Sequence, residues 1–500
     1  MLPAPAAAQA PDTTVGPAAP TATPRTTTLS TGLTLEANAL DVRARSVGNG
    51  TEALVRASPA LTLTHQGARL QGSLVYGGAL TARRGIDDRE DTDYVNSLST
   101  TWLLEAIEGV GFIDARASVT QQAIYVVGTP LDAAGAGTNR TEVITASLSP
   151  YLRGTLGRAV EYELRATGSG TKGDDAAGTS SKAAQASFFL RSPRRGAVLG
   201  WGLSGARQKV KFSAASSATT TDRLGAELSA QPDLDWRFVV TGGQERTDVV
   251  GAVQRDYENY GVGAEWTPSP RTTVSLRGEQ RYFGHGHRVS IEHRLQRSTF
   301  SYVDSRDVTG GADTLAPGNP VTLYELLFAG FASQIPDPAQ RDQFVLAFIQ
   351  ALGRSRDEVV SGGLFGNVGT SVVRRRELVW TWTGPRLTWV ASAFKLDSER
   401  VDAGGFSPPG LNDNVAQTGY AASIGWRLTP LTSVNASGSR AMSTDKTTFA
   451  HTDLKSATLG LTSRLGVRTT GALGVRYSVL NGTTDPHRET ALTGSISLRF

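Results

Sequence analysis

The sequence predicts an all-β fold, namely a transmembrane antiparallel up-and-down β-barrel of about 22 strands, within a range of about 18–22. Three observations lead to this prediction. Apolar residues recur at every second position along most of the chain. The connections between these segments alternate between short and long, and the final segment ends on an aromatic residue.

The final segment, residues 489–500, has one apolar and one polar face. The apolar face carries Leu492, Ile496, Leu498 and Phe500, and the residues between them are mostly polar. A period of two is typical of a strand. The segment resembles the closing strand of bacterial outer-membrane barrels, in which a C-terminal Phe with apolar residues at alternate positions is the insertion signal. We therefore predict that these four residues form the insertion signal. An edge strand of a soluble sandwich is the alternative.

The same alternation recurs from about residue 27 onward. In one segment, for example, the apolar Val160 and Leu164 alternate with the charged Glu161 and Arg165. No run of 18 or more apolar residues exists, so no spanning helix is expected. A membrane barrel needs apolar residues only at alternate positions, which agrees with a hydrophobic content of 39%.

The connections predict two different rims. Tight links are expected near residues 66–67, 108–109, 154–157, 193–196, 231–235, 268–270, 296–297, 384–385, 430 and 465–466. Longer polar links are expected at 83–91, 128–140, 168–181, 213–221, 248–255, 310–370, 399–414, 444–451 and 480–488, with 284–287 as a short exception. Such alternation is typical of periplasmic turns and extracellular loops, so both termini are expected on the periplasmic side of the cell outer membrane of a Gram-negative bacterium.

The N-terminal residues 1–26 are predicted to be a signal-peptide remnant followed by a disordered leader rich in Pro, Thr and Ala. Ala8-Gln9-Ala10 resembles the small-residue end of a secretory signal peptide. The charged and apolar parts of such a signal do not precede it, so a plain Ala/Pro tail is the alternative. The barrel domain is expected to occupy residues 27–500.

A helical insertion is predicted within the barrel domain, at residues 310–370. Asp337 is suited to cap a helix whose first residue is Pro338. One face of that helix would carry Phe344, Val345, Phe348, Ile349 and Leu352. Two interpretations remain open. The segment is either a compact extracellular loop packed on itself, or a lid over the pore mouth whose deletion (312–368) would raise conductance.

Composition and motifs argue against several functions. The sequence has no Cys, so it has no disulfide or thiolate metal site. A net charge of +4 is too small to indicate a nucleic-acid partner. No nucleophile elbow, zincin or P-loop motif is present, so we expect no enzyme, no catalytic residue and no cofactor. His285, His287 and His293 are too few to predict a metal site.

Charged residues on the polar strand faces are expected to line the lumen, because a charge on the lipid face at mid-depth costs about 2–4 kcal/mol. The predicted lumen-lining residues are Arg277, Glu279, Arg281, Arg288, Glu292, Arg294, Arg476 and Arg499. Two interpretations remain open. Mixed Arg and Glu would form a structural ladder of ion pairs, whereas an excess of Arg would favour the passage of anions such as acidic sugars.

Other residues are expected to meet the membrane. The eight Trp residues lie mostly near strand ends, as in an aromatic girdle. Arg207, Lys209 and Lys211 share a strand face with Trp201 and Leu203. They would contact the phosphates of lipopolysaccharide just above the bilayer. A solvated strand tip is the alternative.

Several segments also resemble a known family. They are residues 114–124 (DARASVTQQAI), 139–143 (NRTEV), 149–152 (SPYL), 200–203 (GWGL) with 207–209 (RQK), and 266–272 (WTPSPRT) through 281–284 (RYFG). The chain resembles, over roughly residues 30–500, the PEP-CTERM system-associated outer-membrane proteins of proteobacteria. The resemblance implies a porin-like envelope component linked to exopolysaccharide production or export and to exosortase sorting. Because its motifs are strand and turn sequences, it transfers no functional residue.

From this resemblance we expect a structural or conducting pore. The expected partners are outer-membrane lipid and lipopolysaccharide, the barrel-assembly machinery during insertion, and exopolysaccharide export components. A general diffusion porin and a barrel-borne outer-membrane hydrolase are the alternatives.

Overall fold

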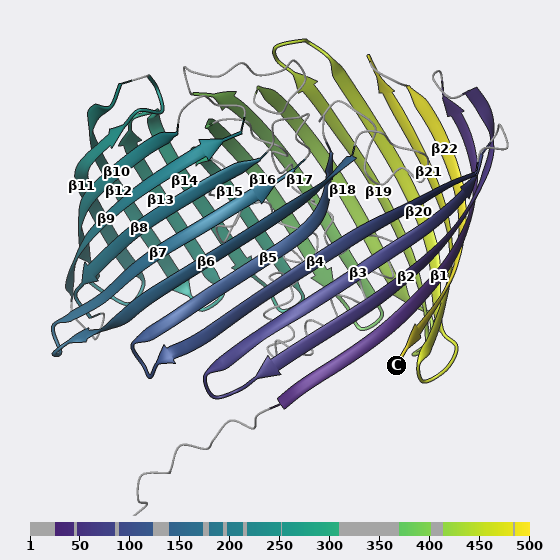
Figure 1. Cartoon of the computed structure of the whole chain (residues 1–500), viewed down its shortest axis with the longest axis horizontal. Coiled ribbons are helices and arrows are strands. Elements are labelled where there is room, and N and C mark those ends of the chain that lie inside the picture. The colour runs from purple at the N-terminus through teal and green to yellow at the C-terminus, as the bar shows by residue number, and fades with distance from the viewer. Residues whose placement is uncertain are drawn as a thin grey trace, which may run out of the picture.

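The computed structural model describes residues 26–44, 48–85, 90–123, 140–173, 180–193, 198–213, 218–251, 253–309, 370–401, 414–483 and 486–500. They form one closed sheet of 22 strands (Figure 1). The strands are β1 (Thr26–Ala44), β2 (Gly48–Gln66), β3 (Leu70–Arg84), β4 (Glu90–Ile107), β5 (Gly111–Ala123), β6 (Arg140–Leu156), β7 (Val160–Lys172), β8 (Ser181–Arg191), β9 (Leu199–Phe212), β10 (Thr219–Ala230), β11 (Trp236–Thr247), β12 (Arg255–Ser269), β13 (Thr272–Arg281), β14 (Gly284–Arg294), β15 (Ser298–Thr309), β16 (Ser371–Thr383), β17 (Leu387–Arg400), β18 (Val415–Arg427), β19 (Thr432–Asp445), β20 (His451–Arg464), β21 (Thr469–Gly482) and β22 (His487–Arg499). In the part of the chain described, no helix is long and apolar enough to cross a membrane.

Closure of the barrel is made by the first and last strands. Each strand pairs antiparallel with the next in sequence, and β22 pairs with β1 from Gly32↔Arg499 to Ala44↔His487. The backbone N–H of Phe500 also donates to the carbonyl of Thr31 at 2.8 Å. Closure leaves no strand edge unpaired in the sheet, which removes the usual site of edge-to-edge aggregation. The predicted antiparallel barrel and its strand number are confirmed.

The two faces of the wall differ as the period of two predicts. On β10 and β12, Leu228 and Val262 are 67% and 65% exposed, whereas the intervening charged residues lie on the other face. In a soluble protein such large apolar side chains would be buried. Their exposure over a closed barrel marks the outer wall as the lipid-facing surface, which we call the apolar belt.

Tryptophans border this belt on one side only. All eight occupy outward positions close to the tight hairpins, namely Trp102, Trp201, Trp236, Trp266, Trp380, Trp382, Trp389 and Trp426. Trp236 stacks on Trp266 with ring centroids 5.5 Å apart. Tryptophan is suited to the headgroup level, because its ring is apolar and its N–H donates a hydrogen bond. The predicted girdle therefore lies at this rim.

The two rims of the barrel have different connections. At the short-turn rim, ten hairpins contain two to seven residues each, and the ten predicted tight links fall there. The first residue of β1 and the C-terminus lie at the same rim (Figure 1). At the opposite, loop rim, the connections range from residues 282–283 to residues 310–370.

Loop lengths are less regular than the sequence predicts. The connection 45–47 is short, although it lies at the loop rim and no link was predicted there. The predicted long links 168–181 and 480–488 were wrong in extent, because β7 continues to Lys172 and β21 to Gly482. The residues at the ends of these links are strand residues, paired for example as Thr171↔Ser181. The predicted leader, and the insertion with Phe344, Val345, Phe348, Ile349 and Leu352, lie outside the described residues.

Polarity inverts along many strands toward the loop rim. On β1 the inward Leu40 and Val42 are 1% and 8% exposed, whereas the outward Asp41 and Arg43 are charged. On β9 the inward Phe212 is 2% exposed and the outward Lys211 is exposed. The barrel therefore has a belt half, apolar outside, and a loop-rim half, charged outside and partly apolar within.

Candidate functional site: arginines on the inner wall

The inner wall carries most of its charges as ion pairs. Pairs on inward positions join Arg116 to Asp114, Arg165 to Glu163, Arg191 to Glu161, Arg237 to Glu227, Arg294 to Glu292, Arg375 to Glu377 and Arg476 to Glu489. Several join residues i and i+2 of one strand, which project side by side from the same face. These pairs correspond to the predicted structural ladder.

The most enclosed pair lies near the loop rim on β11 and β13. Arg281 places its guanidinium 2.7 Å from the carboxylate of Glu245, whose side chain has no exposed surface. The same guanidinium lies 3.1 Å from Asp307 and 3.7 Å from Glu279. Removal of one partner from a buried ion pair leaves an uncompensated charge, so Arg281 is the main counter-charge of the Glu245 carboxylate.

Arg277 and Arg288 are arranged differently. They are direct cross-strand partners on β13 and β14, both face inward, and both are exposed. Among the described residues, neither guanidinium group forms an ion pair or a hydrogen bond. Like charges directly opposite on neighbouring strands repel each other, so the pair is electrostatically unfavourable by itself.

Small neighbours keep this pair accessible. Gly263 of β12 is the partner of Arg277, and a Cβ built there would lie 4.0 Å from Cγ of Arg277. Ser305 of β15 is the partner of Arg288. The two guanidinium groups therefore lie between residues with little or no side chain. The geometry makes a doubly cationic site open to the lumen.

The pair lies at the depth of the apolar belt. The adjacent outward residues Leu276 and Val289 belong to that belt, and Leu276 is 46% exposed. Charges at this depth are tolerated only where water reaches them. Arg277 and Arg288 thus indicate a hydrated interior at their level.

The structure places the other predicted lumen residues on the same inner face. Glu279 lies 3.4 Å from Arg223, and Glu292 pairs with Arg294. Arg499 is exposed at the short-turn rim. Arg476 pairs with Glu489, whose side chain is only 2% exposed, near the loop rim. The eight residues therefore do not form one site, and only Arg277 and Arg288 meet directly without a carboxylate.

Sequence reasoning missed a charged cluster on the outer wall. Nε2 of His287 lies 3.1 Å from Oδ1 of Asp304, and Arg374 and Arg376 lie 3.2 and 3.4 Å from Oδ2. The register of β14, β15 and β16 brings these residues together. Asp304 thus contacts two guanidinium groups and one imidazole, and we observe no serine or threonine hydroxyl bonded to His287 in the described residues. The cluster does not reproduce a hydrolytic triad.

Sequence reasoning also missed the apolar inner wall near the loop rim. Leu40, Val42, Leu54 and Ala491 form a buried cluster across β1, β2 and β22. The signal is present in the sequence as a change of phase, because the apolar residues of β1 shift from odd positions, as in Leu35, to even positions, as in Leu40.

The comparisons with known proteins are limited to structure. No protein-family model matches the chain, and no curated protein matches it. The siderophore receptor PirA from Pseudomonas aeruginosa is similar at 11% identity, with a TM-score of 0.45, over 94% of this chain and 80% of that one. The FrpB iron transporter from Neisseria meningitidis is similar at 11% identity, with a TM-score of 0.49, over 94% and 82%. PirA from Acinetobacter baumannii is similar at 9% identity, with a TM-score of 0.46, over 95% and 81%.

The similarity to these proteins is one of overall fold. The strand pairing, the apolar belt and the girdle of this chain carry the assignment instead. They are the features of a large outer-membrane β-barrel.

Proposed function

We propose that this protein is an outer-membrane pore whose lumen prefers anions. The observation that carries the proposal is the opposed pair Arg277 and Arg288, exposed on the inner wall without a carboxylate partner in the described part of the chain. Charged groups that line a pore set its ion selectivity. The paired arginines elsewhere on the wall add little, because a nearby carboxylate cancels each of their charges.

Acidic polysaccharide is the substrate class that we propose for this lumen. A planar guanidinium binds a carboxylate through two parallel hydrogen bonds, so two adjacent arginines suit a chain of uronic acid residues. The resemblance to outer-membrane proteins of exopolysaccharide loci supports the same class. In this proposal the short-turn rim and both termini face the periplasm, and the loop rim faces the exterior.

Planar-bilayer recording of the refolded full chain tests the proposal. In a KCl gradient, we expect the reversal potential of the wild type to lie on the chloride side. The double variant Arg277→Glu/Arg288→Glu is expected to move it toward potassium. Arg499→Glu is the matched control, because it changes an exposed inner arginine at the rim, and it should leave the preference for chloride intact.

The substrate class has its own readout in the same recording. An oligomer of uronic acid should block the KCl current of the wild type at lower concentration than a neutral oligosaccharide of equal length. Equal block by the two would favour a general diffusion porin. A wild type without conductance or without anion preference would contradict the proposal itself.

A further inference from the structure

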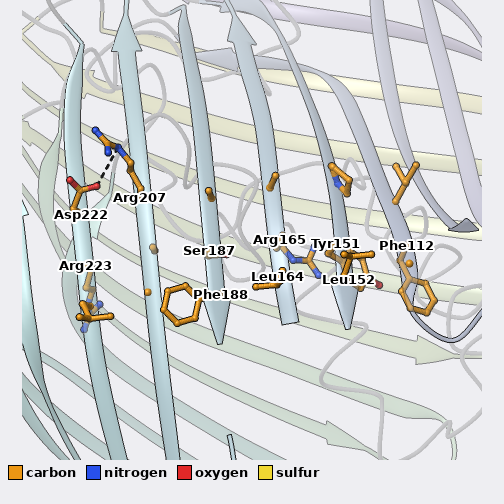
Figure 2. A pocket seen from close by; sticks show the side chains of 18 of the residues that line it. Phe112, Tyr151, Leu152, Leu164, Arg165, Ser187, Phe188, Arg207, Asp222 and Arg223 are labelled. Atoms are coloured by element: carbon orange, nitrogen blue, oxygen red, sulfur yellow. Dashed lines mark ion pairs between the residues drawn. The ribbon is translucent and has the colours of Figure 1, made fainter. Parts of the chain in front are cut away.

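The outer wall of β6–β10 is hollowed. The main hollow encloses about 950 Å³, and a second hollow of about 540 Å³ adjoins it. The two share outward residues that include Pro150, Ala166 and Ala186. Figure 2 shows Leu152, Leu164 and Phe188 on successive strands beside the main hollow.

Small residues create this groove. The outward positions of β7 and β8 at this level are Ala166, Gly168, Ala184 and Ala186, and Gly205 of β9 lies beside them, next to the outward Arg207. A Cβ built on Gly168 would meet no atom within 4 Å, so the space above it is open. A Cβ on Gly205 would overlap the ring of Phe188, which lies across that strand. The part of the groove over Ala166, Gly168 and Ala186, which we call the trough, is therefore apolar and lies on the lipid-facing wall.

Cations border the loop-rim end of the groove. Lys172, Lys182, Lys209 and Lys211 occupy outward positions of β7, β8 and β9, and all four are exposed. Within the described residues none of the four forms an ion pair. Lys182 and Lys211 are direct cross-strand partners, an arrangement that is unfavourable unless an anion lies between them.

One acidic residue lies beside these lysines on the outward face of β10. Asp222 is 3.4 Å from Arg207, whose side chain is 72% exposed (Figure 2). Its charge is thus already shared with an arginine, and the lysines keep their excess positive charge. Cations just above an apolar wall are within reach of the phosphates of a membrane lipid.

We propose that the groove binds one phosphorylated glycolipid of the outer leaflet, with two headgroup phosphates and several acyl chains. Acyl chains occupy the trough over Ala166, Gly168 and Ala186, and the phosphates lie between Lys182, Lys209 and Lys211. The occupant follows from the two observations together. The trough admits acyl chains, and the four lysines carry more positive charge than a single phosphate neutralises. The proposal is independent of the ion preference assigned to the lumen, but it rests on the orientation proposed above, in which the loop rim faces the exterior.

Native mass spectrometry of the refolded full chain in detergent tests this, with diphosphoryl lipid A as the probe. The wild type should retain one lipid A at low probe concentration, and should retain phosphatidylcholine at least about tenfold more weakly. The triple variant Lys182→Gln/Lys209→Gln/Lys211→Gln should lose lipid A retention by about tenfold or more. Lys455→Gln, on the outer wall of β20, is the matched control and should bind as the wild type does.

A second variant tests the trough without changing charge. Gly168→Leu places a side chain in the open space and should also reduce retention of lipid A. Equal retention of lipid A and its fully dephosphorylated form by the wild type would overturn the proposal. So would unchanged retention in both the triple variant and Gly168→Leu. The comparison of lipids uses the wild type alone, so it stands even if a variant fails to fold.

Discussion

The belt half and the loop-rim half of this barrel place apolar and charged residues on opposite faces of the wall. In the belt half the outer wall is apolar, as at Val262, and exposed charges such as Arg277 and Arg288 lie inside. In the loop-rim half the outer wall carries charges such as Lys211, and the inner wall buries Leu40 and Phe212. The difference teaches that strand periodicity alone does not assign a face. What covers each face decides which residues it carries.

The largest expected loss of stability comes from a substitution on the buried inner wall of the loop-rim half. Arg281→Met leaves the carboxylate of Glu245 without its closest cation in a site that has no exposed surface. Such a loss costs about 3–5 kcal/mol, because an unpaired buried charge remains. Urea unfolding of the refolded barrel, followed by tryptophan fluorescence, measures this cost.

Arg294→Gln is the matched control for that substitution. Its partner Glu292 is 40% exposed, so loss of the pair should cost about 0–1 kcal/mol. Equal costs for the two substitutions would show that the two ion pairs are equally solvated, contrary to this structure.

A second substitution tests the apolar inner cluster. Leu40→Ala removes a side chain that is 1% exposed and should cost about 2–5 kcal/mol, through lost burial and the cavity left behind. Leu35→Ala, five residues earlier on the same strand and 48% exposed outward, should cost less in detergent. A larger cost at Leu35 would mean that the inner wall near Leu40 is not packed.

A charge placed in the belt tests the outer wall. Val262→Arg puts a guanidinium on the lipid-facing side, between Trp266 and Tyr260, and should cost about 2–4 kcal/mol in lipid vesicles. Thr241→Arg, one position away across the strand pair and facing inward, should change the free energy of unfolding by about 0.5 kcal/mol or less. Equal costs would contradict the assignment of the two faces.

The smallest expected effect concerns the opposed arginines. Arg288→Glu turns a repulsive cross-strand pair into an attractive one with Arg277, so stability should rise by about 0.2–1 kcal/mol. Thermal unfolding at low ionic strength measures the gain, and added salt should reduce it. A decrease in stability would show that another residue already compensates Arg277 and Arg288.

The sequence predicted the parts of the fold that depend on local pattern. The alternation of apolar and polar residues, as along residues 160–167, predicted the strands and their number. The tight links predicted the short-turn rim. The pattern could not pair Arg281 with Glu245 or His287 with Asp304, because these contacts depend on register between strands. It also could not separate Arg277 and Arg288 from the compensated arginines, since all of them have the same spacing along their strands.

The inverted half was missed for a different reason. Leu40 and Phe212 are apolar residues at alternate positions. For a membrane barrel, the alternation pattern predicts that every such residue faces lipid. Only the change of phase within β1 and β9 marks the inversion. The groove depended on small outward residues of three strands, which become one feature only when Ala166, Ala186 and Gly205 are brought side by side.

Single-cysteine labelling in lipid vesicles tests the central claim most directly, because the chain contains no native cysteine. Ser275→Cys and Leu276→Cys place thiols on adjacent residues of β13, one inward and one outward in the belt half. A water-soluble thiol reagent that carries a fixed charge should modify the inward Ser275→Cys rapidly and the outward Leu276→Cys hardly at all. Faster modification of Leu276→Cys would contradict a barrel whose outer wall faces lipid and whose interior holds water.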